Sequence, residues 1–226
     1  MPDPALFTPE TLKFLRALQQ NNSRDWFNEN KAWYESAWKR PADTFIQALC
    51  FRLQAETDTP HSAKLFRIHR DIRFSKDKTP YNSHLHILIR RDGSRAGLFF
   101  GLQTDRLVLG AGMMGFDKAQ LSAYRDAVAA ASGMALESVL QTLLKDHGRM
   151  NPPELARVPK PFDKDHERGE LLRRKSLTVW RDFDDPSRVE RPDLLDLCSK
   201  QFAAYEGLAD WLGTHIPPAT QGPKRT

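Results

Sequence analysis

The stretch HLHILIR, residues 84–90, alternates polar and apolar side chains with a period of two residues. Because successive side chains of a β-strand point to opposite faces, its leucine and isoleucines would share a buried face. His84, His86 and Arg90 would then lie together on the opposite, open face. The Asp92–Gly93 pair that follows is a strong signal for a tight β-hairpin. This stretch therefore predicts a half-buried strand that turns back on itself.

Similar strand patterns lie on both sides of it. KLFRIHR (64–70) alternates in the same way, and AGLFFGLQ (96–103) and RLVLGAG (106–112) follow the hairpin signal. A further strand is expected at LTVWRDF (177–183). Consecutive strands joined by short turns are typical of an antiparallel sheet. The central part of the chain is therefore predicted to form an antiparallel β-meander with one packed face.

Helical patterns occupy the two ends of the chain. Three helices are expected before residue 60: one opening with Thr8 and Pro9, an aromatic-rich one capped by Ser23, and one opening at Pro41. After the meander, an Asp117–Gln120 capping box should open a helix, and helices should end at Gly133 and Gly148. A long connection is expected over 149–170, followed later by a final helix over 192–212. The predicted class is α+β, with an antiparallel β-meander sheet packed against N-terminal and C-terminal helices.

Length and composition indicate an ordinary globular protein. A chain of 226 residues suffices for one large domain or two small ones, and no linker or internal repeat is visible. We therefore expect a single α+β domain over residues 1–216 and a disordered tail over 217–226. No secretory signal or membrane-spanning run is apparent, and Cys50 and Cys198 lack the neighbouring ligands of a zinc site. These features predict a cytoplasmic protein with two free thiols and no membrane partner.

Positive charge is concentrated in two segments. The net charge is +5, and six lysines and arginines stand against two aspartates between Lys64 and Lys78, a local charge of +4. Seven stand against four acidic residues between Arg157 and Lys175, a local charge of +3. Convergent guanidinium and ammonium groups bind carboxylates and phosphates. The charge distribution therefore points to an anionic ligand.

The segment RIHRDIRFSKDKTPYN, residues 67–82, carries most of the first run. If Phe66, Ile68 and Ile72 face inward, Arg67, His69 and Arg73 share an outward face. The remainder would form a turn around Pro80, with Asp77 and Asn82 making turn hydrogen bonds. Asp71 and Asp77 would orient the arginines through ion pairs. The alternative is a solvated, salt-bridged strand edge that its charge protects from aggregation.

Other motifs have ordinary structural interpretations. His84 and His86 point to one face and could hold a metal with a third ligand, but two histidines on a sheet face are the preferred interpretation, so no metal and no cofactor is predicted. NNSRDWF (21–27) is interpreted as a helix stop, a cap and a core aromatic, with a polar pocket lip as the alternative. The sequence contains no P-loop, nucleophile elbow, zinc-protease motif or dinucleotide fingerprint.

Four blocks resemble a known family: LQQNNSRDWF (18–27), FRIHRDIRFSKDKTPY (66–81), VPKPFDKDHERGELL (158–172) and PDLLD (192–196). They are similar to a family of conserved hypothetical proteins catalogued as domain of unknown function 2461. The resemblance covers nearly the whole chain. It implies no activity, substrate or catalytic residue, because none is established for the family. It does imply that the polar residues of the first two blocks form a signature, which favours a site over a packing rule.

Three functions remain open. The first is a module that binds a phosphate-bearing or other anionic ligand, such as a nucleotide or nucleic acid, through the basic strand and loop. The second is an enzyme on a small anionic substrate, with Asp71, Asp77 or His84 as acid–base groups. The third is a protein-interaction domain in which arginines and aspartates form a structural lattice; it predicts that loss of Arg73 lowers the melting temperature.

The candidate site has two groups of residues, and no catalytic residue is assigned. The anion-binding candidates are Arg67, Arg70, Arg73, Lys76, Lys78 and Tyr81. The supporting candidates are His69, Asp71, Ser75, Asp77, Asn22, Arg24 and Trp26.

Overall fold

The structure, a computed structural model, describes residues 6–219. Backbone contacts divide these residues into two compact units. Unit 1 holds residues 6–92, 98–109 and 182–202, and unit 2 holds 93–97, 110–181 and 203–219. The single domain over 1–216 stays a prediction, and most of the expected tail, 220–226, lies outside the described residues.

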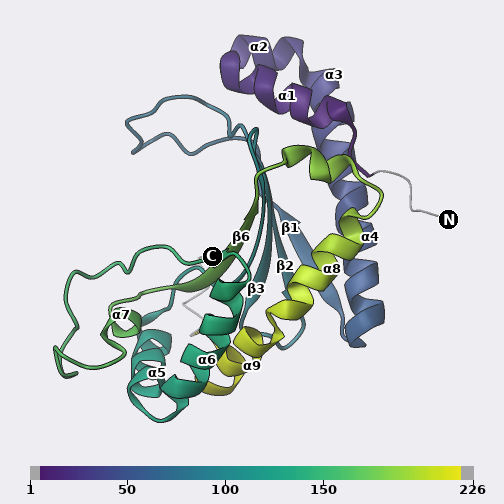
Figure 1. Ribbon diagram of the computed structural model, residues 1–226. Helices are drawn as coiled ribbons and strands as arrows, with labels where there is room; N and C mark the ends of the chain where they lie inside the picture. Colours follow the sequence, from purple (N-terminus) through teal and green to yellow (C-terminus); the bar gives the residue numbers. More distant parts are fainter. Residues whose placement is uncertain (1–5, 220–226) are drawn as a thin grey trace, which may run out of the picture. The chain divides into compact units, whose positions relative to one another are not determined.

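Six antiparallel strands form the sheet, in the order β1-β2-β3-β4-β6-β5 (Figure 1). The strands are β1 (His61–Leu65), β2 (Leu85–Arg91), β3 (Gly97–Leu102), β4 (Leu107–Met113), β5 (Gly148–Arg149) and β6 (Leu177–Phe183). Strands β1 to β4 lie side by side in the order in which they occur in the chain, as expected for a β-meander. Strand β2 alternates buried and partly exposed residues because only one of its faces is covered. The predicted α+β class is confirmed.

Helices of unit 1 flank the strands of that unit. They are α1 (Pro9–Gln20), α2 (Arg24–Glu29), α3 (Lys31–Tyr34), α4 (Arg40–Thr57) and α8 (Leu194–Ala204), with a π-helical turn at Glu35–Lys39 and a 3₁₀ turn at Pro186–Glu190. Of α8, residues 194–202 belong to unit 1. The starts expected at Pro9 and after Ser23 are confirmed, and the Ser23 hydroxyl accepts a hydrogen bond from the Trp26 amide at 3.3 Å. The start expected at Pro41 is wrong, because the chain is already helical from Lys31 and continues through the π-helical turn into α4. Figure 1 shows α4 and α8 side by side, and Arg52 of α4 donates to Asp196 of α8 at 2.6 Å.

Aromatic rings fill the core of unit 1. Phe7, Phe45 of α4 and Phe100 of β3 are almost fully buried, and their ring centroids lie 4.6–6.2 Å apart. A second cluster surrounds Phe14 of α1, whose ring lies 5.4 Å from that of Trp33 and 6.0 Å from that of Trp26. Buried aromatic pairs add about 0.5–1.5 kcal/mol each beyond the area they remove from water. The aromatic residues of the N-terminal third therefore pack α1, α2 and α3 together and join α4 to β3.

Unit 2 contains α5 (Lys118–Ala129), α6 (Ser132–Lys145), α7 (Gly169–Leu172) and α9 (Glu206–His215). The capping box of Asp117 and Gln120 is confirmed. Trp211 of α9 donates from its indole nitrogen to the Ser132 carbonyl at 2.9 Å. The connection over 150–168 contains no helix or strand, as expected.

Three further predicted helix boundaries are wrong. Gly133 does not end a helix but lies in the first turn of α6, where a Cβ would come within 2.1 Å of the Val128 carbonyl oxygen. Gly148 belongs to β5, and His147 adopts the positive φ of 58° that the glycine was expected to supply. The helix expected over 192–212 is broken at Tyr205, between α8 and α9. At Gly133 and Gly148 a Cβ would come within 2.1 and 2.3 Å of a carbonyl oxygen, so close backbone approach and not a helix end accounts for each glycine.

Between residues 6 and 219, no single helix has the length and apolar character needed to cross a bilayer. The pair α5 and α6 passes by length and composition when taken together, but it is bent by 91°.

Substitution of Gly112 by alanine should strongly destabilise the fold. Gly112 has φ 129°, and a Cβ there would lie 2.0 Å from the Leu177 carbonyl oxygen, a backbone atom that cannot rotate away. We expect a loss of about 3 kcal/mol or more in the free energy of unfolding, measured by urea denaturation. The matched control is Gly213→Ala, in α9 with open space around the position, which should stabilise by up to about 1 kcal/mol. Similar midpoints for the two variants would contradict this account.

Candidate functional site

The basic segment is an irregular loop and not a strand. Strand β1 ends at Leu65, and residues 66–84, named here the central loop, reach beyond the ends of β1 and β2 (Figure 1). The expected strand over 64–70 is therefore wrong beyond Leu65, and Phe66, expected to face inward, is 43% exposed. The reason lies in backbone pairing. After Phe66 the loop bonds to its own returning half, with the Asn82 amide donating to the Ile68 carbonyl at 2.7 Å and Arg70 to Pro80 at 2.9 Å.

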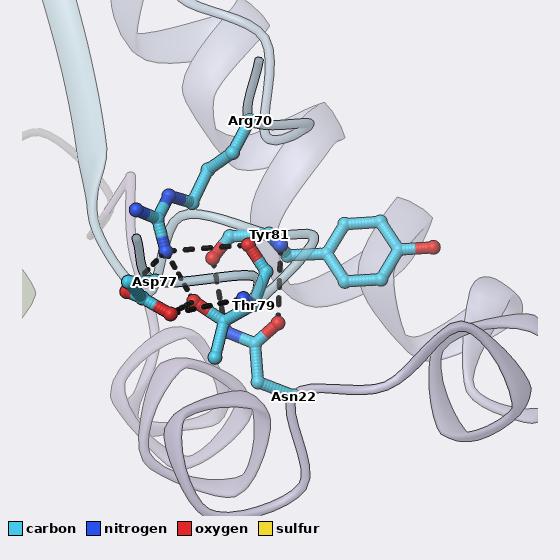
Figure 2. Close-up of polar contacts among 5 residues, drawn as sticks. All are labelled: Asn22, Arg70, Asp77, Thr79 and Tyr81. Carbon is cyan, nitrogen blue, oxygen red and sulfur yellow. Dashed lines mark hydrogen bonds and ion pairs between the residues drawn. The ribbon is translucent and has the colours of Figure 1, made fainter. Parts of the chain in front are cut away.

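Arg70 holds the base of the central loop (Figure 2). Its Nη1 donates to Asp77 Oδ2 at 2.5 Å, to the Thr79 carbonyl oxygen at 3.2 Å and to the Thr79 hydroxyl. Asp77 also accepts from the Thr79 amide at 2.9 Å, and this bond together with Arg70 lowers the pKa of Asp77 to about 2. Asp77 thus pairs with an arginine, and its predicted role in orienting that arginine for a ligand stays a prediction. Nη2 and Nε of Arg70 have no hydrogen-bond partner among residues 6–219.

Asn22 joins the loop to the start of α2. Its side-chain amide donates to the Tyr81 carbonyl at 2.9 Å, and its carbonyl accepts from the Tyr81 amide at 3.0 Å (Figure 2). The Tyr81 ring points away from these contacts and stacks on Phe27 with centroids 4.2 Å apart. Tyr81 is 5% exposed. Asn22 and Tyr81 therefore anchor the loop in the structure, and a role for Tyr81 in ligand binding stays a prediction.

The tip of the loop is charged and exposed. Arg73 makes a two-point contact to the Asp71 carboxylate, at 2.9 Å from Nε and 2.6 Å from Nη2, which lowers the pKa of Asp71 to about 2. Phe74 beside it is 96% exposed. Lys78 donates to the Ile72 carbonyl at 3.0 Å, and the Lys76 ammonium has no partner in the described part of the chain. Ser75 lies at the same tip, where its amide donates to the Ile72 carbonyl at 3.3 Å.

A hollow of about 310 Å³ lies between the loop and β2. Its lining residues come from both halves of the loop and from the strand: Phe66, Arg67, His69, Arg70, Asp71, Asn82, His84 and His86. The Arg67 guanidinium makes no hydrogen bond or ion pair with residues 6–219. Asp71 is the acidic residue of this lining, and its charge is already paired with Arg73. The hollow therefore has an excess of positive charge.

His84 and His86 form one wall of the hollow. They share a face, as predicted, and their rings stack with centroids 3.9 Å apart. Burial lowers the pKa of both, with Arg70 adding to the effect at His84, and the pKa of His86 falls to about 4. Both rings are thus neutral near pH 7, each with one N–H donor. Across the described residues, no group of three His, Cys, Asp or Glu side chains is arranged to hold a metal ion.

The structure divides the predicted site residues into three sets. Arg67, His69, Arg70 and Asp71 line the hollow. Arg73, Ser75, Lys76 and Lys78 lie toward the loop tip, and the Asp77 side chain among them contacts Arg70. Asn22, Arg24 and Trp26 belong to the start of α2, where Trp26 packs among the aromatic rings. Sequence reasoning missed Phe66 and Asn82 as lining residues and assigned the two histidines no anion-binding role. The alternation of HLHILIR was the signal that placed both histidines on one open face.

The second basic run is partly structural. Arg168 is buried and donates from Nε to the Val128 carbonyl at 2.7 Å, which closes the end of α5. Arg174 is also buried, donating to the Asn151 carbonyl at 2.6 Å and pairing with Glu170 at 2.8 Å. The local +3 charge of residues 157–175 therefore overstates the charge that this run presents to a ligand.

Comparison with known proteins identifies a family. A family model described as "Conserved hypothetical protein (DUF2461)" matches residues 10–211. No curated protein and no solved structure matches the chain.

Substitution of Asn22 by alanine should loosen the central loop. It removes both hydrogen bonds to Tyr81 and leaves a buried amide and carbonyl unpaired, at about 1–3 kcal/mol. Hydrogen exchange at the Tyr81 amide should accelerate, and the midpoint of urea unfolding should fall. The control is Asn21→Ala, which removes one exposed bond within its own helix. Equal exchange rates of the Tyr81 amide in the two variants would show that the Asn22 hydrogen bonds do not hold the loop.

The neutral histidine pair should make stability depend on pH. Protonation is harder in the fold than in the unfolded chain, whose histidines titrate near 6.5. The contribution of His86 is therefore complete above about pH 6.5 and falls as the pH drops toward about 4. Proton NMR should place the His86 midpoint near 4, and His86→Asn should flatten the loss of stability between pH 6.5 and 4. A midpoint near 6.5 would contradict the burial argument.

Proposed function

The chain belongs to this family of conserved hypothetical proteins, and we propose that it binds a phosphate or carboxylate group in the hollow beside the central loop. One observation carries the proposal: Arg67, the spare donors of Arg70 and two neutral imidazoles border one hollow whose acidic residue is already paired. Guanidinium groups hold oxyanions by two parallel hydrogen bonds, and imidazole N–H groups can add further donors.

The arrangement supplies donors without first breaking structural contacts. Arg67 has no hydrogen bond to give up among the described residues, only a longer-range attraction to Asp71, and Arg70 keeps its hold on the loop through Nη1 alone. Asp71 adds little repulsion because Arg73 neutralises it at 2.6 Å. An anion would replace the water around these donors at small cost in rearrangement, which favours affinity.

The class of ligand follows from these donors. Phosphate monoesters, nucleotides and the backbone of a nucleic acid all present oxygens of the required kind. The chain has two free cysteines, Cys50 and a fully buried Cys198, and burial raises the pKa of both thiols. Free thiols of this kind suit the reducing cytoplasm, where we propose that the protein acts.

A second candidate is an enzyme acting on a small anionic substrate, and the histidine pair favours it. Burial lowers the pKa of both imidazoles, and a bound phosphate beside them would raise it again, toward the range in which a histidine accepts a proton at physiological pH. Asp71 and Asp77 are poor candidates for proton transfer near neutral pH, since each has a pKa of about 2 and is committed to an arginine.

The third candidate, a structural lattice, is favoured at Arg70 and not at Arg73. The Arg70 side chain is 25% exposed and holds the loop at its base, whereas that of Arg73 is 76% exposed and pairs with a near neighbour. Exposed pairs contribute about 0–1 kcal/mol. Loss of Arg73 should therefore change the melting temperature little, contrary to what a lattice centred on it requires.

The test follows the histidines while inorganic phosphate and a mononucleotide are titrated. Binding should shift the His84 and His86 resonances and raise the pKa of both, because an adjacent anion favours the charged imidazole. Arg67→Ala should weaken binding about tenfold or more, whereas Arg40→Ala, an exposed arginine of α4, should leave it unchanged. If saturating phosphate leaves both resonances unmoved, the proposal fails.

A further inference from the structure

A second hollow lies next to the first on the open face of β1 and β2. It measures about 370 Å³ and is lined by Ser62, Ala63, Lys64, Phe66, Leu88 and Arg90. The strand register pairs Ser62 with Arg90 and Lys64 with Leu88, which brings residues from both strands into this hollow. Phe66 lines both hollows. The two hollows therefore meet at Phe66, and together they are named here the basic track, whose lining extends from Arg90 past Phe66 to Arg67.

Cations follow the basic track along its length. Lys64 and Arg90 are exposed, and neither makes a hydrogen bond or ion pair with the described chain. The lining of the second hollow contains no acidic residue. Lys64 pairs with Leu88, so Lys64 and Arg90 are diagonal neighbours on adjacent strands, at about 7–8 Å, and Arg67 follows three residues after Lys64. The cations are therefore spaced as a row and not as a cluster. A row of this kind matches a chain of phosphates better than a single phosphate group.

Phe66 adds an aromatic surface in the middle of the row. Phe66 is 43% exposed, and the Lys64 ammonium lies 5.6 Å from its ring centroid. The Phe66 amide donates to the His86 carbonyl at 2.9 Å, so the backbone beneath the ring is held to β2. Exposed aromatic rings beside cations are the elements by which proteins hold unpaired bases, at about 1–3 kcal/mol per stacked base. In a duplex the base faces are already stacked and do not reach such a ring.

We propose that the basic track binds single-stranded nucleic acid, with phosphates along Arg90, Lys64 and Arg67 and a base stacked on Phe66. This inference rests on the proposed function, because the first hollow would hold one phosphate of the strand. It adds that the ligand is a polymer and that β1 and β2 carry part of the contact. Binding is sequence-tolerant, since stacking and phosphate contacts read no base edge.

The experiment measures fluorescence anisotropy with labelled oligothymidylates of two to eight nucleotides, alongside inorganic phosphate binding followed at His84 and His86. Affinity should rise with length until the track is filled. The double variant Lys64→Ala/Arg90→Ala should lose at least tenfold in oligonucleotide affinity while binding phosphate as the wild type does. The slope of log K against log salt should become shallower by about 1.4, or about 0.7 for each lost contact.

Two controls separate charge from stacking. Lys31→Ala/Arg40→Ala removes the same charge from exposed helical positions and should leave oligonucleotide affinity within about twofold, because screened charges away from the track contribute little. Phe66→Ala should weaken oligonucleotide binding several-fold more than Phe66→Tyr, which keeps a ring. Melting curves verify that each variant is folded.

The possible outcomes distinguish this inference from the proposed function. Phosphate binding with no gain for oligonucleotides would overturn the basic track and leave the first hollow standing. Equal affinity for duplex DNA or inorganic polyphosphate, with no effect of Phe66→Ala, would overturn the assignment to single strands. Absence of both phosphate and oligonucleotide binding would overturn both proposals together.

Discussion

The architecture around the site depends on how the backbone N–H and C=O groups of the central loop find hydrogen-bond partners. Residues 66–84 leave the sheet after β1, so they lose strand partners that would otherwise bond their peptide groups. The loop bonds to itself between Ile68 and Asn82, while Arg70 and Asn22 supply side-chain donors and acceptors where the backbone cannot. These contacts hold the loop on α2 and leave Arg67 and the two histidines beside one hollow. The need to pair the backbone N–H and C=O groups of the central loop therefore also fixes the shape of the charged hollow beside it.

Much of the fold was predictable because one-sided burial leaves a clear pattern. The alternation in HLHILIR predicted β2 and the shared face of its histidines, and the apolar run after Arg106 predicted β4. The same alternation failed after Leu65. There the apolar residues take different environments, with Ile68 buried and Phe66 open to solvent. Periodicity reports which side chains alternate, but the backbone partner of a strand is set by tertiary contacts that lie outside the local sequence.

The site was predictable as a region but not residue by residue. Arg70 and Arg73 look alike in the sequence, each with an aspartate a few positions away, and both pairs form. One of them is a structural clamp and the other a surface pair, a difference that only burial reveals. The basic run around Arg168 and Arg174 shows the same limit, since carbonyl groups take up much of its donor capacity. Counting charges locates basic segments, whereas the geometry of their partners decides which charges remain for a ligand.

The exposed tip of the central loop has a consequence for the continuity of the chain. Arg73 and Phe74 stand in solvent, while both arms of the loop are fastened at its base by Arg70 and Asn22 and, beyond it, by the pairing of β1 with β2. A peptide bond broken at the tip would release neither arm, because each keeps its own contacts. The tip is therefore a natural point at which to divide the gene into two fragments that reassemble, or to place new termini in a circular permutation.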